Sequence, residues 1–299
     1  MSAPFSRVLV VGATGQLGSE LMRVFADCAP LGPARAELDL SRPDELTPAL
    51  ARLRPSLVIN TAAFHQVDAC EADPATAFAI NALGTDALAS AAAAAGATFA
   101  HVSTDYVFDG LKGAPYAESD AARPLNVYGI SKLAGERLAA RHAPRCFVFR
   151  TSGLYGRSGV SNKGPVFVEK MLRGAERGDA LRVVDDVIFS PSYAPHVAEA
   201  MRRVLESEAF GLYHLTDAGA CSWWEFAVEA IRLRGLAPQV AAVKTARSPG
   251  AAQRPAYSAL DHAALRAGGY PAMPPWQEGL RAYLAVRAAR QDASAPASM

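Results

Sequence analysis

Three glycines near the start of the chain constrain its fold more than any other feature. An apolar run at 8–11 is followed by Gly12, Gly15 and Gly18, and the next residues have a helical pattern. Gly12 would permit a tight turn, Gly15 would let the backbone approach a pyrophosphate, and Gly18 would let the helix press on the sheet. A helix that starts there points free N–H groups at an anion. The order of strand, glycine turn and helix predicts a dinucleotide-binding turn rather than a plain structural one.

Short β-branched runs alternate with longer alanine-rich helical patterns through the first half of the chain. Strands that are apolar on both faces and separated by helices are typical of a parallel sheet covered on both sides. We therefore predict an α/β fold, with a Rossmann-type, doubly wound parallel sheet. The expected strands are 7–11, 57–63, 98–103 and 146–151, and the expected helices are 16–28, 73–95 and 127–142.

The pattern loosens after about Leu154, where glycine and proline become frequent. We predict an NAD(P)-binding Rossmann domain over residues 1–154 and a smaller substrate-binding domain over residues 155–299. A strand is expected near 211–217, and it belongs either to the smaller domain or to the first sheet. Residues 291–299 are expected to form a disordered tail. Further helices are expected at 166–177, 193–206, 222–234, 259–267 and 276–287, and strands at 181–184 and 212–216.

Charge and composition exclude several classes of protein. Lys and Arg number 30 against 29 Asp and Glu, so no basic surplus exists to neutralise a nucleic-acid backbone. No uninterrupted apolar run reaches the roughly 18 residues that a membrane helix needs, and the N-terminus lacks the layout of a signal peptide. The cysteines form no CxxC pair and the histidines show no ligand spacing, so we predict neither a disulfide frame nor a bound metal. We expect a cytoplasmic protein.

A phenol and an ammonium are placed together by sequence spacing. Tyr128 and Lys132 are four residues apart in the predicted helix 127–142, so they share one of its faces. Upstream, a predicted strand leads into Thr104 and Asp105, at the carboxyl edge of the sheet where ligands bind in such folds. Because an ammonium favours a nearby phenolate, we expect Lys132 to lower the pKa of Tyr128 toward neutral pH. Tyr128 would then act as a general acid, while Thr104 holds a substrate oxygen.

Other residues give weaker signals. No acid that would bind a ribose 2′-hydroxyl is evident between residues 28 and 39, where Arg35 and Glu37 are the only charged residues. Arg35 is a candidate for a 2′-phosphate, which favours NADPH slightly over NADH, although an ordinary solvated arginine is equally open. Tyr106 and Phe108 either flank the substrate or pack in the core. Arg254 is a candidate for a nucleotide diphosphate.

Longer motifs resemble a known family. They are Ser103-Thr-Asp-Tyr-Val-Phe-Asp-Gly110, Pro124-Leu-Asn-Val-Tyr-Gly-Ile-Ser-Lys-Leu-Ala-Gly-Glu136 and Arg254-Pro-Ala-Tyr-Ser258. Together with the glycine turn, they are similar to the extended short-chain dehydrogenase/reductases. More narrowly, they resemble the dTDP-4-dehydrorhamnose reductase family over nearly the whole chain.

This resemblance implies an activity and a set of contacts. The activity is reduction of the C4 ketone of dTDP-4-dehydro-β-L-rhamnose by NAD(P)H, and a homodimer is a further expectation. Tyr128 would donate the proton, Lys132 would bind the nicotinamide ribose, and Thr104 and Asp105 would lie at the sugar. The remaining cofactor contacts would come from Gly12, Thr14, Gly15, Gln16, Leu17 and Gly18 at the phosphates, from Asp39 and Leu40 at the adenine, and from Ala62, Ala63 and His65.

One departure from the family pattern concerns the sugar pocket. Where the family usually has Thr-Ser-Trp, this chain has Thr151-Ser152-Gly153, so an aromatic surface beside the sugar is expected to be lost. Two alternatives therefore stay open. The first is a reductase or epimerase that acts on another nucleotide-linked 4-keto deoxysugar. The second is a non-catalytic, dinucleotide-binding regulatory subunit, against which the presence of Thr104, Tyr128 and Lys132 argues.

Overall fold

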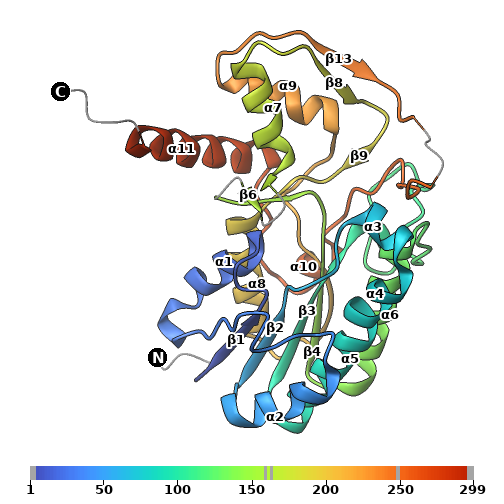
Figure 1. The fold of residues 1–299 in the computed structure, drawn as a ribbon, viewed down its shortest axis with the longest axis vertical. Coiled ribbons are helices and arrows are strands. Elements are labelled where there is room, and N and C mark those ends of the chain that lie inside the picture. The colour runs from blue at the N-terminus through green and yellow to red at the C-terminus, as the bar shows by residue number, and fades with distance from the viewer. Residues whose placement is uncertain (1–4, 158–159, 162–163, 247–249, 295–299) are drawn as a thin grey trace.

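A five-stranded parallel sheet forms the centre of the molecule (Figure 1). The computed structural model describes residues 5–157, 160–161, 164–246 and 250–294. The strands lie in the order β1-β2-β3-β4-β11, and every neighbouring pair is parallel. Their bounds are Val8–Val11, Leu57–Asn60, Thr98–Thr104, Cys146–Thr151 and Gly211–His214. At the outer edge of β1, Leu31 forms an isolated parallel bridge with Leu9.

Helices cover both faces of this sheet, which confirms the predicted doubly wound fold (Figure 1). On one face, α1 (Gln16–Val24) and α8 (Ala194–Leu205) pack on alternate strand residues such as Val8 and Ile59. On the other face, α2 (Pro43–Leu53), α5 (Thr85–Ala94) and α6 (Val127–His142) pack on the residues between them. Because both faces are buried, the strands are mostly apolar, and their polar residues, such as Asn60, His101 and Arg150, are buried as well.

The expected helix 73–95 contains three segments: α4 (Pro74–Phe78), the π-helical turn η2 (Ala79–Gly84) and α5. By length and composition, the stretch Pro74–Ala94 is apolar enough to cross a membrane. However, 56% of its most apolar window is buried inside the structure, where it packs against α2 and α6. This burial is typical of a core helix.

A second lobe consists of α7 (Phe167–Glu176), α9 (Trp223–Leu233), α11 (Trp276–Ser294), β8 (Leu181–Val184) and β13 (Val240–Val243), and it lies beyond the carboxyl edge of the sheet (Figure 1). Its aromatic core includes Tyr155, Phe226 and Tyr283. Ser222 caps α9 through a reciprocal pair of hydrogen bonds with Glu225. The other elements are η1 (Ala26–Cys28), α3 (Val67–Ala72), η3 (Asp105–Val107), β5 (Leu154–Tyr155), β6 (Val160–Ser161), β7 (Gly164–Pro165), β9 (Ile188–Phe189), β10 (Ser192–Tyr193), β12 (Cys221–Ser222) and α10 (Ala263–Ala267).

Several sequence predictions match these bounds and others do not. The strands predicted at 146–151 and 181–184 and the helix at 127–142 are confirmed. The strand near 211–217 joins the first sheet as β11, while the division of the chain at residue 154 stays a prediction. The tail predicted at 291–299 is wrong for its first four residues, because α11 continues to Ser294. Residues 295–299 lie outside the described residues.

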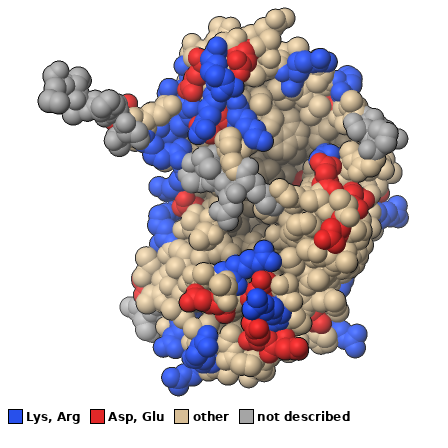
Figure 2. All heavy atoms as spheres, viewed as in Figure 1, with Lys and Arg blue, Asp and Glu red and all other residues tan. Residues whose placement is uncertain are grey.

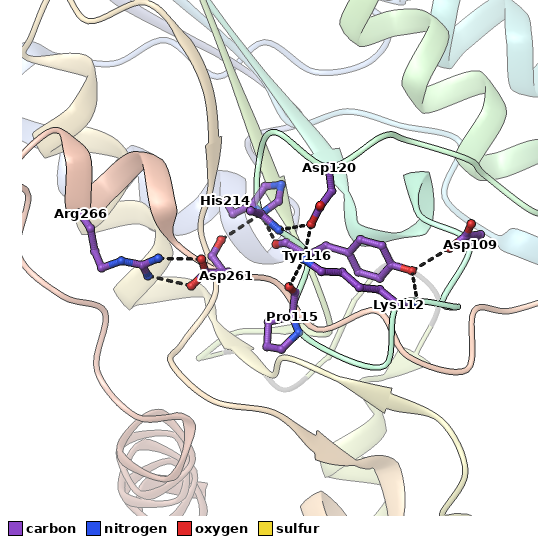
Figure 3. Close-up of polar contacts among 9 residues, drawn as sticks. Asp109, Lys112, Pro115, Tyr116, Asp120, His214, Asp261 and Arg266 are labelled. Atoms are coloured by element: carbon purple, nitrogen blue, oxygen red, sulfur yellow. Dashed lines mark hydrogen bonds and ion pairs between the residues drawn. The ribbon is translucent and has the colours of Figure 1, made fainter.

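A polar network fixes the loop after η3 to the C-terminal part of the chain (Figure 3). The Tyr116 hydroxyl donates to Asp109 (2.7 Å), and the Lys112 ammonium donates to Asp120. The Nδ1–H of His214 donates to the backbone carbonyls of Tyr116 (3.1 Å) and Asp261 (3.0 Å). Because burial lowers the pKa of His214 to about 3, this histidine stays neutral. The network holds the segment that follows Arg254 against the sheet.

Candidate active site

A cleft of about 380 Å³ opens at the carboxyl edge of the sheet. Figure 2 shows the surface hollowed between the second lobe and the part of the molecule that contains the sheet. The cleft is lined by residues from the start of α1, the ends of β3 and β4, and the first turns of α6. The residues that line it are Gly15, Gln16, Leu17, Gly18, Thr61, Ala63, His65, Val102, Ser103, Thr104, Asp105, Tyr128, Lys132, Thr151, Ser152, Gly153, Leu154 and Val166.

The glycine turn has the tight geometry that the sequence predicts. Gly12 has a φ of +83°, and a Cβ atom on Gly18 would lie 2.1 Å from the Gly12 carbonyl oxygen. Side chains at these two positions would therefore break the turn. Gly15 precedes α1 and contributes no side chain that would cap the amides of the first helical turn. These amides lie at the cleft, at the positive end of the helix dipole, where an anion would be stabilised.

Helix α6 brings Tyr128 and Lys132 into the cleft. Asn126 caps the helix by accepting a hydrogen bond from the Gly129 amide (2.8 Å). A Cβ atom on Gly129 would lie 2.1 Å from the Tyr106 carbonyl oxygen, so the glycine lets α6 press against η3. The ring of Tyr106 meets that of Tyr128 edge to face at 6.1 Å. These contacts hold the phenol at the mouth of the cleft.

Tyr128 is a neutral phenol, contrary to the expectation that Lys132 lowers its pKa. Burial raises the pKa of Tyr128 well above its ordinary value, and the hydrogen bond with Thr104 offsets this only in part. The charge of Asp105 adds to the increase. The physical reason is that desolvation in the cleft penalises the phenolate more than its partners stabilise it. A neutral phenol retains the proton that a general acid must donate.

Lys132 is held by the strand beneath it. Its Nζ atom donates to the Val102 carbonyl (2.7 Å) and lies 3.0 Å from Nε2 of His101. The side chain is 1% exposed, and burial lowers its pKa to about 7, against a weak opposing effect of Glu136. His101 is also fully buried and hydrogen-bonded. Burial and the nearby Lys132 lower the pKa of His101 well below its ordinary value.

Asp105 is a buried carboxyl group surrounded by hydroxyls. Its oxygens accept hydrogen bonds from Ser258 (2.6 Å), Ser152 (2.9 Å) and Thr104 (3.1 Å). Burial raises the pKa of Asp105 to about 6, although the three hydroxyls act in the opposite direction. The carboxyl group thus joins the ends of β3 and β4 to the C-terminal segment that contains Ser258.

A buried ion pair supports this arrangement from below. Glu136 of α6 accepts two hydrogen bonds from Arg150 of β4 (2.9 and 2.7 Å) and one from Ser103 (2.5 Å). The Arg150 guanidinium also lies over the ring of Phe108, 5.1 Å from its centroid. The pair fixes α6 across two strands of the sheet, one helical turn beyond Lys132.

Several predicted site residues are not among the described residues that line the cleft. Phe108 packs in the core, which is one of the two places predicted for it, and its fully buried ring is stacked on Tyr116 at 4.2 Å. Arg35 is exposed and forms an ion pair with Asp39 (3.0 Å). Arg254 pairs with Asp68 (2.8 Å). The cofactor and substrate contacts proposed for Gly12, Thr14, Arg35, Asp39, Leu40, Ala62, Tyr106 and Arg254 stay predictions.

The structure also adds residues that the sequence reasoning did not place in the site. Ser103, Thr151 and Ser152 lie at the ends of β3 and β4, beside predicted residues. The rule that ligands bind at the carboxyl edge of a parallel sheet was the signal that could have found them. Val166 comes from the start of α7, and no local pattern marks it as part of the cleft.

The space beside Gly153 is filled by another aromatic residue. A Cβ atom on Gly153 would lie 2.3 Å from the ring of Phe189, and Gly153 has a φ of +49°. The Phe189 ring stacks on Trp223 at 3.8 Å. A tryptophan at 153 would therefore clash with the Phe189 ring.

No metal site is visible in the part of the chain that the structure describes. Within it, no group of three or more His, Cys, Asp and Glu side chains is placed to hold a metal ion. The polar side chains of the cleft are hydroxyls, the carboxyl group of Asp105, the amine of Lys132, the amide of Gln16 and the imidazole of His65. This set is suited to proton transfer and hydrogen bonding to a sugar.

A parallel sheet with a glycine turn, and a Tyr–Lys pair beside it, define an extended short-chain dehydrogenase/reductase. The chain belongs to the family described as RmlD substrate binding domain, which it matches over residues 6–288. It is 38% identical to the spore coat polysaccharide biosynthesis protein SpsK of Bacillus subtilis, over 96% of this chain and 100% of that protein. It is 37% identical to the dTDP-4-dehydrorhamnose reductase of Aggregatibacter actinomycetemcomitans, over 86% and 90% of the two chains.

A solved structure shows the same arrangement. The dTDP-4-dehydrorhamnose reductase of Bacillus anthracis, in complex with NADP, superposes with a TM-score of 0.88. That protein is 34% identical in sequence, and the match covers 93% of this chain and 98% of that one. The family resemblance predicted from the sequence is confirmed.

Proposed function

We propose that this protein reduces the C4 ketone of dTDP-4-dehydro-β-L-rhamnose to give dTDP-L-rhamnose, with NADPH or NADH as the hydride donor. The observation that carries the proposal is the placement of Thr104, Tyr128 and Lys132 in one cleft with the glycine turn. The named relatives, which are aligned over most of their length, support the same substrate.

The cleft fits a dinucleotide. The uncapped start of α1 presents backbone amides to the cleft, and the close approach of Gly18 to Gly12 leaves no room for side chains at the turn. Gly15, Gln16 and Leu17 would hold the phosphates, and Lys132 would bind the nicotinamide ribose. When bound, the reduced nicotinamide supplies the hydride that the carbonyl carbon accepts. We lean towards NADPH because of Arg35, although its ion pair with Asp39 must open or adapt for that contact.

Proton delivery is the task of this chain's own residues. The neutral Tyr128 hydroxyl holds the proton that the carbonyl oxygen receives as hydride reaches the carbon. Thr104, whose hydroxyl is paired with both Tyr128 and Asp105, orients the substrate oxygen. An ammonium form of Lys132 would stabilise the phenolate that remains after transfer. Asp105 and Ser152 are placed to accept and donate hydrogen bonds at the sugar.

Gly153 and the Phe189–Trp223 stack favour a second candidate substrate. Because Gly153 lines the cleft and the Phe189 ring lies directly beside it, the cleft wall at this position differs from one that a tryptophan would form. The alternative is a reductase or epimerase that acts on another nucleotide-linked 4-keto deoxysugar. The SpsK relative, named for a spore coat polysaccharide, is compatible with either sugar.

The test is turnover with a panel of 4-keto sugars linked to dTDP and to UDP, with NADPH and NADH supplied separately. We expect the fastest oxidation of the dinucleotide with dTDP-4-dehydrorhamnose. Faster turnover of another sugar would make that sugar the preferred substrate, and the proposed reduction of a 4-keto group would stand. If no sugar is reduced, the regulatory-subunit alternative gains support. The homodimer and the cytoplasmic location stay predictions.

A further inference from the structure

A line of buried polar groups lies beneath the cleft and ends at Lys132. From Lys132 it leads to His101, whose Nε2 lies 3.0 Å from Nζ. On the other side of the imidazole ring, Nδ1 of His101 lies 3.3 Å from Nδ2 of Asn60. The side chain of Asn60 also donates to the hydroxyl of Thr85 (3.3 Å). Lys132, His101, Asn60 and Thr85 are all buried, so these groups must satisfy one another.

The orientation of the Asn60 amide is fixed from the backbone. Its Oδ1 accepts a hydrogen bond from the Ala62 amide (3.1 Å). If the amide were rotated by half a turn, its NH₂ group would face that backbone N–H, and two donors would meet. The NH₂ group of Asn60 must therefore point at His101 and Thr85.

This orientation decides which nitrogen of His101 holds its proton. Because Asn60 donates toward Nδ1, that nitrogen must be the acceptor, and the proton of the neutral ring is on Nε2. The Nε2–H then points at Lys132 Nζ. An uncharged amine can accept this hydrogen bond and still donate to the Val102 carbonyl. A charged ammonium has no lone pair, so it would place donor against donor.

We propose that His101, oriented by Asn60, keeps Lys132 as an uncharged amine in the ligand-free protein, and that dinucleotide binding is coupled to uptake of one proton at Lys132. His101 is thus a positioning residue. The second half of the inference rests on the proposed function, whereas the first half concerns the protein alone.

The charged groups around Lys132 do not remove the conflict that an ammonium at Lys132 would create, in which two hydrogen-bond donors, Nζ and the Nε2–H of His101, face each other. From its own helix, Glu136 favours the ammonium, but its carboxylate is already paired with Arg150 of β4. Tyr128 is a neutral phenol, and Asp105 of η3 interacts with three hydroxyls. The other elements packed on α6 contribute further titratable groups. These are Tyr106 of η3, Asp68, Cys70 and Glu71 of α3, Cys146 of β4, and Asp86 of α5, which pairs with His142. Consistently, burial lowers the pKa of Lys132 to about 7.

The proton balance is simple. The lone pair of Lys132 Nζ takes one proton from solvent, an N–H bond forms, and the hydrogen bond from His101 is lost. Nothing is oxidised or reduced. The phosphates of a dinucleotide and the hydroxyls of its ribose favour a cation in the cleft, so binding compensates for the lost hydrogen bond. The ammonium needed to stabilise a phenolate would then exist only when the cofactor is present.

The first test uses the ligand-free protein. Nitrogen NMR of ¹⁵N-labelled histidine distinguishes the two neutral tautomers, and a His101→Gln variant assigns the resonance among the six histidines. We expect His101 to be neutral with its proton on Nε2. A proton on Nδ1 would overturn the inference, because Lys132 could then remain charged and donate to Nε2.

The second test is calorimetry of NADPH binding in buffers of different ionisation enthalpy. With a pKa of about 7 for the free amine, we expect uptake of about 0.9 proton per site at about pH 8. Asn60→Ala frees the Nδ1 side of His101 and should reduce this uptake to about half or less. Thr85→Val removes the other partner of Asn60 but leaves its orientation, so it is the matched control and should behave like the wild type.

Each outcome has a clear meaning. NADPH binding without proton uptake by the wild type overturns the inference and leaves the proposed function intact. If the wild type binds neither NADPH nor NADH, the proposed function fails, and the NMR result decides the inference alone. Equal loss of uptake in Asn60→Ala and Thr85→Val would contradict the role of the Asn60 orientation. If Asn60→Ala does not fold, His101→Gln replaces it, since its amide oxygen can accept from the ammonium and should likewise reduce the uptake.

Discussion

Two buried basic side chains of this protein have opposite surroundings. Arg287, in the second lobe, is 3% exposed and forms ion pairs with Glu169 (2.9 Å) and Glu176 (2.7 Å). Lys132, in the cleft, is 1% exposed, and the described partners of its Nζ atom are an imidazole and a backbone carbonyl. Arg287 contacts two carboxylates, whereas the described contacts of Lys132 include none.

The difference in surroundings indicates a structural role for Arg287 and a functional role for Lys132. The two glutamates raise the pKa of Arg287 further above its ordinary value, so it is charged under all relevant conditions and stabilises the second lobe. Burial lowers the pKa of Lys132 to about 7, so its charge responds to whatever enters the cleft. A group that costs stability and titrates near neutral pH is typical of a functional site.

The largest effect should follow from loss of the proton donor. We expect Tyr128→Phe to lower the turnover number by about 100-fold or more, because a positioned acid is lost. The control is Tyr283→Phe in the second lobe, which removes a hydrogen bond to Glu169 (2.6 Å) and leaves the cleft unchanged. The control should lose about 1 kcal/mol of stability and retain its turnover. Unchanged turnover in Tyr128→Phe would contradict the assignment of the acid.

Removal of the structural cation should weaken the fold. We expect Arg287→Met to lower the free energy of unfolding by about 3 kcal/mol, because two carboxylates lose their buried partner. Urea unfolding followed by circular dichroism measures this change. A variant as stable as the wild type would contradict the structural role that the comparison assigns to Arg287.

Replacement of Lys132 in the cleft by methionine should change the free energy of unfolding in the opposite direction. In the absence of cofactor, we expect Lys132→Met to raise the free energy of unfolding by about 2 kcal/mol at about pH 6. The folded-state pKa of about 7 lies below the ordinary value of 10.5. Below about pH 7 the folded protein bears the full free-energy cost of a buried ammonium. This cost disappears as the pH rises from about 7 toward 10.5. The advantage of the variant should shrink over that range, and destabilisation at about pH 6 would refute the interpretation.

The smallest effect concerns Asp105. Its folded-state pKa of about 6 lies above the ordinary 3.8, so its contribution to stability is fully present below 3.8 and is lost as the pH rises through 6. We expect Asp105→Asn, which stays neutral, to be more stable than the wild type by about 1 kcal/mol at neutral pH and equal to it below about pH 4. Thermal unfolding across this range tests the trend, and a stability difference that does not vary with pH would argue against it.

Local patterns were sufficient to predict much of the fold and part of the site. The helix 127–142 was predicted with its observed bounds from an alanine-rich helical pattern that lies between two β-branched runs. The glycine turn was predicted because each glycine has a separate steric reason. The Tyr–Lys pair follows from helical spacing alone, since residues four apart share a face.

The rest depends on contacts between distant residues. The prediction that Lys132 lowers the pKa of Tyr128 was wrong for the ligand-free protein, because burial raises this pKa and outweighs the opposing hydrogen bond with Thr104. The partners His101 and Asn60 come from neighbouring strands, and their sequence positions do not reveal the register that aligns them. The contact between Gly153 and Phe189 likewise depends on how the second lobe packs on the sheet.

The central claim is that the cleft transfers a hydride to the C4 ketone of a dTDP-linked sugar. Its most direct test uses NADPH labelled with deuterium at the transferable position of the nicotinamide, together with dTDP-4-dehydrorhamnose. Mass spectrometry and NMR of the product should find one deuterium, bound to C4 of the sugar. A product without deuterium, or with deuterium at another carbon, would contradict the claim.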